Sequence, residues 1–302
     1  IYSRAKEKPG FIYKAACSRG FTNFLGFINY DIILSKSKIN KIIKELNINK
    51  DECLEDIDNF RKLRQVFERK IKYYEFRPMA DKKDEIVSPA DCRMLIGSFS
   101  ESSIVTIKNK FFDYEELLQK DKWCQSFSGG DFVICRLTPD KYHYNHLPVT
   151  GVVEDIYLID GAYHSCNPNA VIKVVTPYSK NKRVVTIINT DTPSGTNIGM
   201  VAMIEIVAMM IGGIKQCYSE VGYDSPKTLI RGMTLKKGQP KSLFRPGSST
   251  TVLIFQKNRI KFHPDLTVNV RRKDVPSRFS LGFGESIVET EVAVRSGIAT
   301  KG

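Results

Sequence analysis

The stretch that decides the fold is Leu243–Phe255, which reads LFRPGSSTTVLIF. A turn of Gly, Ser and Thr residues leads directly into an unbroken apolar run rich in β-branched side chains. Such runs are typical of buried strands when turn residues bound them. Taken alone, the hydroxyl residues are favoured as a plain turn, because Gly and Ser suit turns and Thr suits the start of a strand. A catalytic serine at the mouth of a core strand is the alternative.

Segments of the same β type occupy most of the chain after Asp84. Turn residues bound each of them, and one helix, near Tyr114–Lys120, interrupts them. A closing strand is expected within Gly282–Val292. So many short strands predict a mostly antiparallel β sandwich or barrel. The expected strands are Glu85–Val87, Arg93–Ser98, Ile104–Ile107, Phe132–Leu137, Gly151–Leu158, Val171–Val175, Val184–Ile188, Met200–Ile206 and Val252–Gln256.

The residues before Asp84 have a helical pattern instead. Apolar side chains recur at three- and four-residue spacing from Tyr13 to about Leu54, and again over Asp56–Lys72. We therefore predict an α+β protein, with a helical N-terminal region over residues 1–80 that caps a catalytic domain over residues 81–302. The first helical face packs against the core or rests on lipid, and the sequence leaves both readings open.

The chain is strongly basic, with 46 Lys and Arg against 33 Asp and Glu. Such a charge is typical of proteins that meet nucleic acid, an anionic membrane or an acidic ligand. No run is dense enough for a nucleic-acid arm, and no zinc-finger or RNA-reading spacing occurs, so nucleic acid is not expected as a partner. The spread of the basic residues along the chain favours a membrane face, with a merely soluble basic protein as the alternative.

The seven cysteines are scattered and form no CxxC pair. We expect reduced thiols in a cytosolic setting rather than a disulfide or zinc framework. The most apolar segment, Val201–Ile214, is too short to span a bilayer and contains Glu205, so we expect it in the core and any membrane contact to be peripheral. The chain begins with Ile1, which leaves a preceding targeting segment open.

Two of the four histidines, His143 and His146, fall in the Pro- and Tyr-rich segment Leu137–Gly151. An i, i+3 pair could ligate a metal, but no cysteine or carboxylate cluster completes such a site nearby, so no metal is expected. Because histidine titrates near neutrality, the pair is a candidate for acid–base chemistry. Plain loop residues are the alternative.

Asp91 follows a predicted strand and a proline turn in Val87–Arg93, which reads VSPADCR. A turn aspartate that bonds its own backbone is the commoner case. The functional alternative is a carboxylate that orients a histidine, as in a Ser-His-Asp relay.

Three of these segments together resemble the phosphatidylserine decarboxylases in order and spacing. They are Ser88–Asp91, Tyr142–Pro148 and Gly247–Thr250, and weaker matches lie in Phe60–Pro78 and Gly161–Pro168. The resemblance implies a self-processing enzyme that converts phosphatidylserine to phosphatidylethanolamine with a covalent pyruvoyl cofactor. It further implies peripheral attachment to an anionic membrane on the cytoplasmic side. The implied partners are the lipid and the β and α chains of one precursor, and a homodimer stays open.

The resemblance also implies a role for each candidate residue. A serine attacks the carbonyl of the residue before it, while a histidine held by the aspartate serves as base, which carries over to His146 and Asp91. The chain then splits and leaves the serine as an N-terminal pyruvoyl group, which forms a Schiff base with the substrate amine and acts as electron sink while CO2 leaves. His143 is the implied substrate-side group, assisting decarboxylation or reprotonation.

The processing serine itself is open to two assignments, because the family's Gly-Ser-Thr motif reads Gly-Ser-Ser-Thr here. Counting forward from Phe244 and back from Phe255 favours Ser249, with cleavage of the Ser248–Ser249 bond. Family members with Gly-Ser-Ser would instead point to Ser248 and cleavage of the Gly247–Ser248 bond.

Three further departures from the family pattern lie near the motifs. Cys92 replaces a glycine after Asp91, Tyr144 replaces an arginine that could meet substrate phosphate or carboxylate, and Gly238–Ser242 lacks the usual acids. They keep open a second hypothesis, a lipid-binding relative that neither cleaves nor decarboxylates. A serine hydrolase built on the same three residue types ranks last, because no Gly-x-Ser-x-Gly elbow is present.

Overall fold

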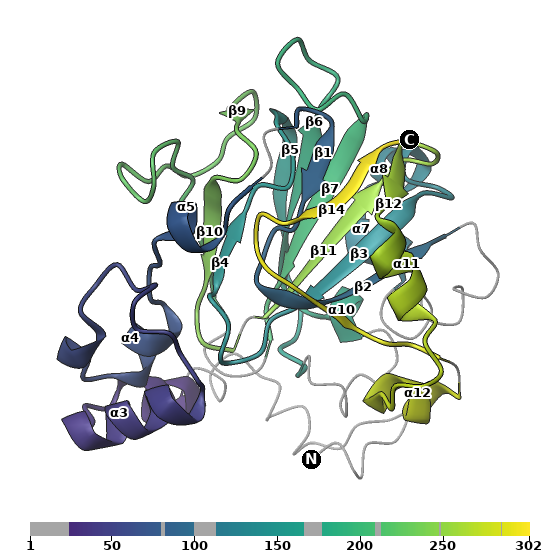
Figure 1. Cartoon of the computed structure of the whole chain (residues 1–302). Helices are drawn as coiled ribbons and strands as arrows, with labels where there is room; N and C mark the ends of the chain where they lie inside the picture. The colour runs from purple at the N-terminus through teal and green to yellow at the C-terminus, as the bar shows by residue number, and fades with distance from the viewer. Residues whose placement is uncertain are drawn as a thin grey trace.

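The computed structural model describes residues 24–79, 82–99, 113–165, 177–208, 213–247, 249–284 and 286–302. Its centre is one eight-stranded antiparallel sheet (Figure 1). The strands of this sheet are β2 (Cys92–Ser98), β3 (Asp131–Arg136), β5 (Gly151–Ile159), β6 (Arg183–Asn189), β7 (Met200–Ile206), β9 (Thr234–Leu235), β11 (Thr250–Phe255) and β13 (Thr290–Val292). They are ordered β13-β2-β3-β11-β7-β6-β5-β9. The β-rich α+β class is confirmed, and the described strands form a sandwich without a closed barrel.

The decisive stretch forms a central strand, as its composition predicts. All six residues of β11 are buried, and β11 pairs with β3 on one side and with β7 on the other. Side chains of both faces are therefore covered, which explains why the strand is continuously apolar rather than alternating.

Two smaller antiparallel sheets complete the β structure. One contains β1 (Glu85–Val87), β14 (Gly297–Lys301) and β12 (Ile260–Phe262), in that order. The other contains β4 (Tyr144–His146), β10 (Pro240–Phe244) and β8 (Ile214–Gln216). The second lies on one face of the large sheet, because the Asn145 side chain accepts a hydrogen bond from Thr251 of β11.

Helices cover the opposite face. Arg183 of β6 reaches this layer, where its guanidinium donates to the Leu117 carbonyl in α7. Figure 1 shows α11 beside β2. The helices after the N-terminal region are α7 (Tyr114–Leu118), α8 (Asp121–Ser126), α10 (Pro177–Lys180), α11 (Pro264–Val270) and α12 (Arg278–Phe283).

The N-terminal region is helical in short pieces around its own small core, which includes Ile39, Ile43 and Phe60. Its elements are η2 (Phe27–Asp31), α3 (Lys36–Glu45), η3 (Ile57–Asn59), α4 (Leu63–Phe67) and α5 (Tyr73–Phe76). The expected division at residue 80 stays a prediction.

The single helix expected over Asp56–Lys72 is wrong. The backbone at Phe60 is extended, and the Gln65 side chain accepts from the Arg61 and Lys62 amides to start a separate helix. Arg69 then lies buried after that helix, donating to the carbonyls of Val66, Asp140 and Lys141. The apolar spacing belongs to two short elements that cover the same core.

The closing strand expected within Gly282–Val292 is only partly right. Its last three residues form β13, whereas α12 extends to Phe283 at the other end. The Ser280 side chain turns the chain between them, accepting from the Ile287 amide. The strands expected at Ile104–Ile107 and Val171–Val175 lie outside the described residues. Five cysteines in the described part are free thiols.

Candidate active site

Ser249 lies directly before β11, at the end of the large sheet. Its carbonyl accepts a hydrogen bond of 2.8 Å from the Leu137 amide, so its backbone is already held by the chain that continues from β3. Two residues earlier, Gly247 has φ +96°, a left-handed conformation that favours glycine. The turn is therefore fixed on both sides of residue 248, and Ser248 itself lies outside the described residues.

The histidine segment reaches the same end of the molecule through β10. Strand β4 pairs with β10, and the Phe244 amide donates to the His143 carbonyl at 3.0 Å. Because β10 runs directly into the turn before Ser249, this pairing joins two motifs that are far apart in the sequence. The pairing joins the two backbones, whereas the side chains of His143 and His146 each have different neighbours.

His146 is fully buried, and both of its ring nitrogens are engaged. Nδ1 lies 2.8 Å from the Gly238 carbonyl, which can only accept, so Nδ1 carries the proton. Nε2 is then the acceptor of the Tyr142 hydroxyl at 2.9 Å. Burial lowers the pKa of His146 to about 3, so the ring is neutral at physiological pH.

An aromatic shell surrounds this histidine. The Tyr142 hydroxyl also lies 2.7 Å from that of Tyr223, which is bonded to the Ile71 backbone. The Tyr73 ring meets His146 edge-on, with centroids 4.7 Å apart. Gln239, at the position where the family pattern has an acid, accepts from the Tyr73 hydroxyl. The shell excludes water and fixes the His146 tautomer.

Asp91 is not hydrogen-bonded to His146 within the part of the chain that the structure describes. Its carboxylate takes a forked pair of bonds from Arg77, of 2.9 and 2.7 Å, and one from the Val294 amide. The negative charge of Asp91 still favours the protonated form of His146, although burial outweighs it in the pKa. The orienting role of Asp91 therefore stays a prediction.

His143 differs from its neighbour in having one free nitrogen. Nδ1 donates to the Lys141 carbonyl at 2.8 Å, while the buried Nε2 has no hydrogen-bond partner among the residues that the structure describes. The ring stacks on Phe67 of α4 with centroids 3.5 Å apart. Burial, and then the charge of Arg69, lower the pKa of His143 to about 3. An uncharged imidazole with an open lone pair can accept a proton or bind a donor on a ligand.

Comparison with known proteins now places this geometry in a family. Residues 63–288 match the family model described as phosphatidylserine decarboxylase. The chain belongs to the phosphatidylserine decarboxylase family. The matched range contains the aspartate, both histidines and both candidate serines, so the resemblance seen in the three motifs is confirmed.

Curated relatives match over most of their length. A protein of Clostridium perfringens is 32% identical over 278 residues, covering 92% of this chain and 86% of its own. Proteins of Clostridium tetani and Clostridium botulinum are each 30% identical over 272 residues, covering 90% of this chain and 81% and 83% of theirs. All three are named phosphatidylserine decarboxylase proenzyme.

The structure of this family member adds a buried polar group that the motifs do not include. Glu205 and Lys241 are both fully buried and form an ion pair of 2.7 Å. Ser242 donates to the same carboxylate, and its hydroxyl also accepts from Asn145, which lies between the two histidines. Thr251 closes the group by donating to Asn145 at 2.8 Å. These side chains hold β10 against β7 and β11, beside the turn that precedes Ser249.

A sequence signal for this polar group did exist. Glu205 is the one acidic residue of the apolar segment Val201–Ile214, and a charge in a core strand needs a buried partner. The partner could not be chosen, because several lysines flank β10 and the pairing of β10 with β4 and β8 has no signature in the sequence. No cluster of metal-ligating side chains occurs among the described residues.

Proposed function

We propose that this protein is a self-processing phosphatidylserine decarboxylase, which forms phosphatidylethanolamine and CO2. The observation that carries the proposal is that the family match includes both the histidine strand and the serine turn, two segments that β10 ties together. The relatives' name, proenzyme, agrees with a chain that must be cut before it acts.

The proposed processing step uses the chain's own groups. The Ser249 hydroxyl oxygen attacks the carbonyl carbon of residue 248, an ester bond forms, and the peptide C–N bond breaks as its nitrogen takes a proton. In the elimination that follows, a base takes the Cα proton of residue 249 and the Cβ–O bond breaks, which releases the β chain as a carboxylate. The resulting enamine tautomerises to an imine, and water hydrolyses this imine, releasing ammonia and leaving the pyruvoyl group. The left-handed Gly247 and the held Ser249 carbonyl restrict the turn in which this occurs.

The histidine strand fits a pyruvoyl group at residue 249, because the buried Nε2 of His143 has no hydrogen-bond partner among the described residues. When present, the pyruvoyl group supplies an electron sink for the carbon that loses CO2. His143 is the proposed substrate-side residue, because its orphaned buried Nε2 can accept a hydrogen bond or a proton. His146 is the proposed base in processing. For this, its Nε2 must give up the hydrogen bond from the Tyr142 hydroxyl and accept the hydroxyl proton of the serine. Asp91 favours that protonation through its charge.

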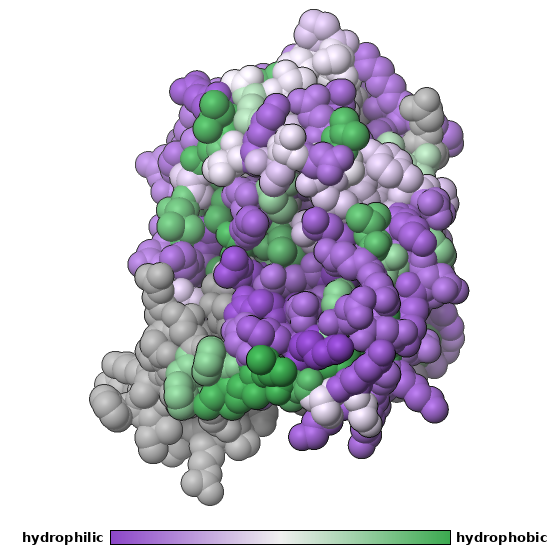
Figure 2. Space-filling model, turned by 90° about the vertical axis from the view of Figure 1, so that its left-hand side faces the viewer, coloured by the Kyte–Doolittle hydropathy of each residue, from purple (hydrophilic) through white to green (hydrophobic). Residues whose placement is uncertain are grey.

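We also propose that the protein attaches peripherally to an anionic membrane, on its cytoplasmic side. Apolar side chains of the N-terminal region are exposed, by 60% for Phe24 and 74% for Ile33. Figure 2 shows apolar residues gathered at the lower edge of the face that carries this region. In the described residues no helix is both long and apolar enough to cross a bilayer. Burying these side chains in lipid would anchor the chain beside its substrate.

Intact mass spectrometry of the purified protein tests the processing step. We expect two chains, the shorter beginning at residue 249 and blocked to Edman sequencing, together with CO2 release from phosphatidylserine vesicles. Ser249→Ala should remain one chain, whereas Ser248→Ala should still be cut. The reverse pattern would move the cleavage to the Gly247–Ser248 bond. A single uncut, inactive wild-type chain would refute the proposal.

A second candidate is a relative that binds lipid without maturing. The observation that favours it is the geometry of the predicted relay, in which Arg77 holds Asp91 and Tyr142 occupies His146. It predicts that the intact chain binds phosphatidylserine vesicles and releases no CO2.

A further inference from the structure

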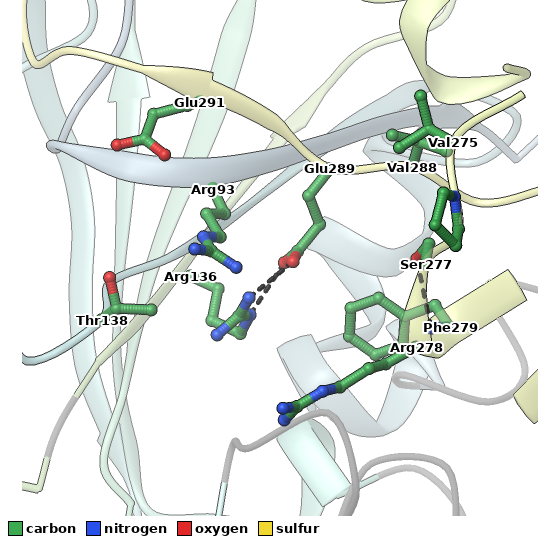
Figure 3. A pocket seen from close by; sticks show the side chains of 11 residues that line it. Arg93, Arg136, Thr138, Val275, Ser277, Arg278, Phe279, Val288, Glu289 and Glu291 are labelled. Atoms are coloured by element: carbon green, nitrogen blue, oxygen red, sulfur yellow. Dashed lines mark hydrogen bonds and ion pairs between the residues drawn. The ribbon is translucent and has the colours of Figure 1, made fainter. Parts of the chain in front are cut away.

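A cavity of about 510 Å³ opens between β2, β3 and the C-terminal helix α12 (Figure 3). Three arginines of different elements line it, Arg93 from β2, Arg136 from β3 and Arg278 from α12. Figure 3 shows the guanidinium groups of Arg93 and Arg136 turned into the same space. The sequence gives no hint of this convergence, because the three residues belong to no common motif.

The cavity lies beside the processing turn. Arg93 is directly opposite Arg136, and Arg136 is directly opposite Thr250, the residue after Ser249. Residues opposite one another on neighbouring strands point to the same face of a sheet. Thr138, which also lines the cavity, follows the Leu137 amide that holds the Ser249 carbonyl. One row of side chains therefore runs from the cavity to the point of cleavage.

The free charge of the cavity is positive. Its two carboxylates already have cationic partners, since Glu289 takes a forked pair of bonds from Arg136 and Glu291 binds Lys141. Among the described residues, neither Arg93 nor Arg278 has a carboxylate within ion-pair distance. Two guanidinium groups without counter-ions at one cavity favour a ligand with phosphate or carboxylate oxygens, which they bind in a forked geometry.

A hydroxyl group adds a donor on the same side. The side-chain oxygen of Thr250 is buried and has no hydrogen-bond partner among the described residues. A buried hydroxyl without a partner is costly, and an acceptor on a ligand would remove that cost. The histidine strand itself offers no cation, because Tyr144 stands where the family pattern has an arginine and stacks on Tyr142 in the core.

We propose that this cavity binds the phosphodiester group of the substrate headgroup, with Arg93 and Arg278 as its cations. The proposal rests on the proposed function. In phosphatidylserine only one oxygen and two carbons separate the phosphorus from the amine nitrogen. A phosphate held at this row of side chains therefore keeps the amine next to residue 249, where it must react. The cavity would take over the task of the arginine that Tyr144 replaces.

A kinetic comparison tests the site in the mature enzyme. The double variant Arg93→Gln, Arg278→Gln should cleave normally, because neither side chain supports the fold through an ion pair. Its KM for phosphatidylserine in mixed micelles should rise about tenfold or more, with kcat little changed, as expected for lost charge-assisted bonds. Arg93→Lys, Arg278→Lys should recover part of the loss. Arg231→Gln, which removes an arginine with a 75% exposed side chain on another face, should behave as wild type.

Normal cleavage of the double variant with an unchanged KM would overturn the site and leave the proposed function intact. Failure of the wild-type chain to cleave would refute the function instead. In that case binding still tests the cavity. Uncleaved Ser249→Ala protein should bind glycerophosphoserine, and the double variant should bind it at least tenfold more weakly. Equal binding of inorganic phosphate and glycerophosphoserine would assign the cavity to free phosphate and overturn the headgroup proposal, as would equal binding by both proteins.

Discussion

Thr250 and Thr251 are neighbours in β11, yet they face two very different regions of the molecule. Thr251 joins the closed polar group of Asn145, Ser242, Glu205 and Lys241. Thr250 stands in the row that leads to the arginine cavity, and in the described part of the chain its hydroxyl has no hydrogen-bond partner. The polar side chain on one face of β11 is thus hydrogen-bonded into a buried group. The other face has an unpaired hydroxyl in one row with the arginines of the cavity. The residues around Thr251 therefore stabilise the structure, whereas those in the row of Thr250 have polar groups that can bind a ligand.

The largest effect on stability should come from breaking the Glu205–Lys241 ion pair of the closed polar group. Glu205→Gln leaves the Lys241 ammonium buried without a countercharge, which we expect to cost about 3–5 kcal/mol of unfolding free energy. Urea denaturation of the uncleaved Ser249→Ala background measures it. The pair Glu205→Leu, Lys241→Met should recover most of the loss, since both charges are then removed. A loss below about 1 kcal/mol in Glu205→Gln would show that the pair is solvated.

The two buried histidines, His143 and His146, should make stability depend on pH. Burial lowers both pKa values to about 3 from an ordinary value near 6.5, so the unfolded chain binds more protons between these limits. Stability is then fully present above pH 6.5 and is lost as pH falls toward 3, by about 1.4 kcal/mol per pH unit for each histidine. Denaturation at several pH values measures the slope, and His143→Gln should lower it by about 1.4 kcal/mol per pH unit. A flat profile from pH 6.5 to 4 would contradict neutral burial.

A smaller effect should follow from removing one hydroxyl of the aromatic shell. Tyr142→Phe leaves Nε2 of His146 without its donor, which we expect to cost about 1–2 kcal/mol and to change the rate of chain cleavage. Tyr144→Phe is the matched control, because its ring stacks in the same cluster and its hydroxyl has no described hydrogen bond. Gel analysis of cleavage over time compares them. Equal behaviour of both variants would show that the Tyr142 hydroxyl does not position His146.

The smallest change compares the two threonines directly. Thr251→Val should cost about 1 kcal/mol, because it leaves the Asn145 carbonyl oxygen unpaired. Thr250→Val should cost almost nothing or stabilise the free protein, since its hydroxyl is buried without a partner. The same thermal unfolding experiment serves for both. Equal losses would mean that the two faces of β11 are alike.

The sequence predicts well what depends on local pattern. Continuous β-branched runs place β11, β7 and β6, and the serine turn is found because Gly and Ser residues precede an apolar strand. It fails where side-chain hydrogen bonds, some local and some between distant residues, decide the course of the backbone. The helix expected over Asp56–Lys72 is divided by side-chain bonds of Gln65 and Arg69 that no periodicity records. Strand β14 is missed because only two of its five residues are buried.

The candidate site shows the same limit. Short motifs supply Asp91, His143, His146 and Ser249 as residue types, and the family match contains all four. Their bonds could not be predicted, because the partners come from elsewhere in the chain. Arg77 meets Asp91 across fourteen residues, and Gly238 meets His146 across ninety-two. The arginine cavity depends on the pairing of β2 with β3 and on the position of α12, and neither is encoded by the spacing of residues along the sequence.

The central position of β11 has a consequence for the cut protein. A break before Ser249 would place the new N-terminus between β3 and β7, with β11 bonded on both sides. The shorter chain would also supply β13 beside β2 and β14 beside β1. The two products would therefore stay joined through four pairs of neighbouring strands, β11–β3, β11–β7, β13–β2 and β14–β1. Separating the products would require breaking the hydrogen bonds of all four pairs. Cleavage before Ser249 would therefore break the backbone while β11 stays paired with β3 and β7.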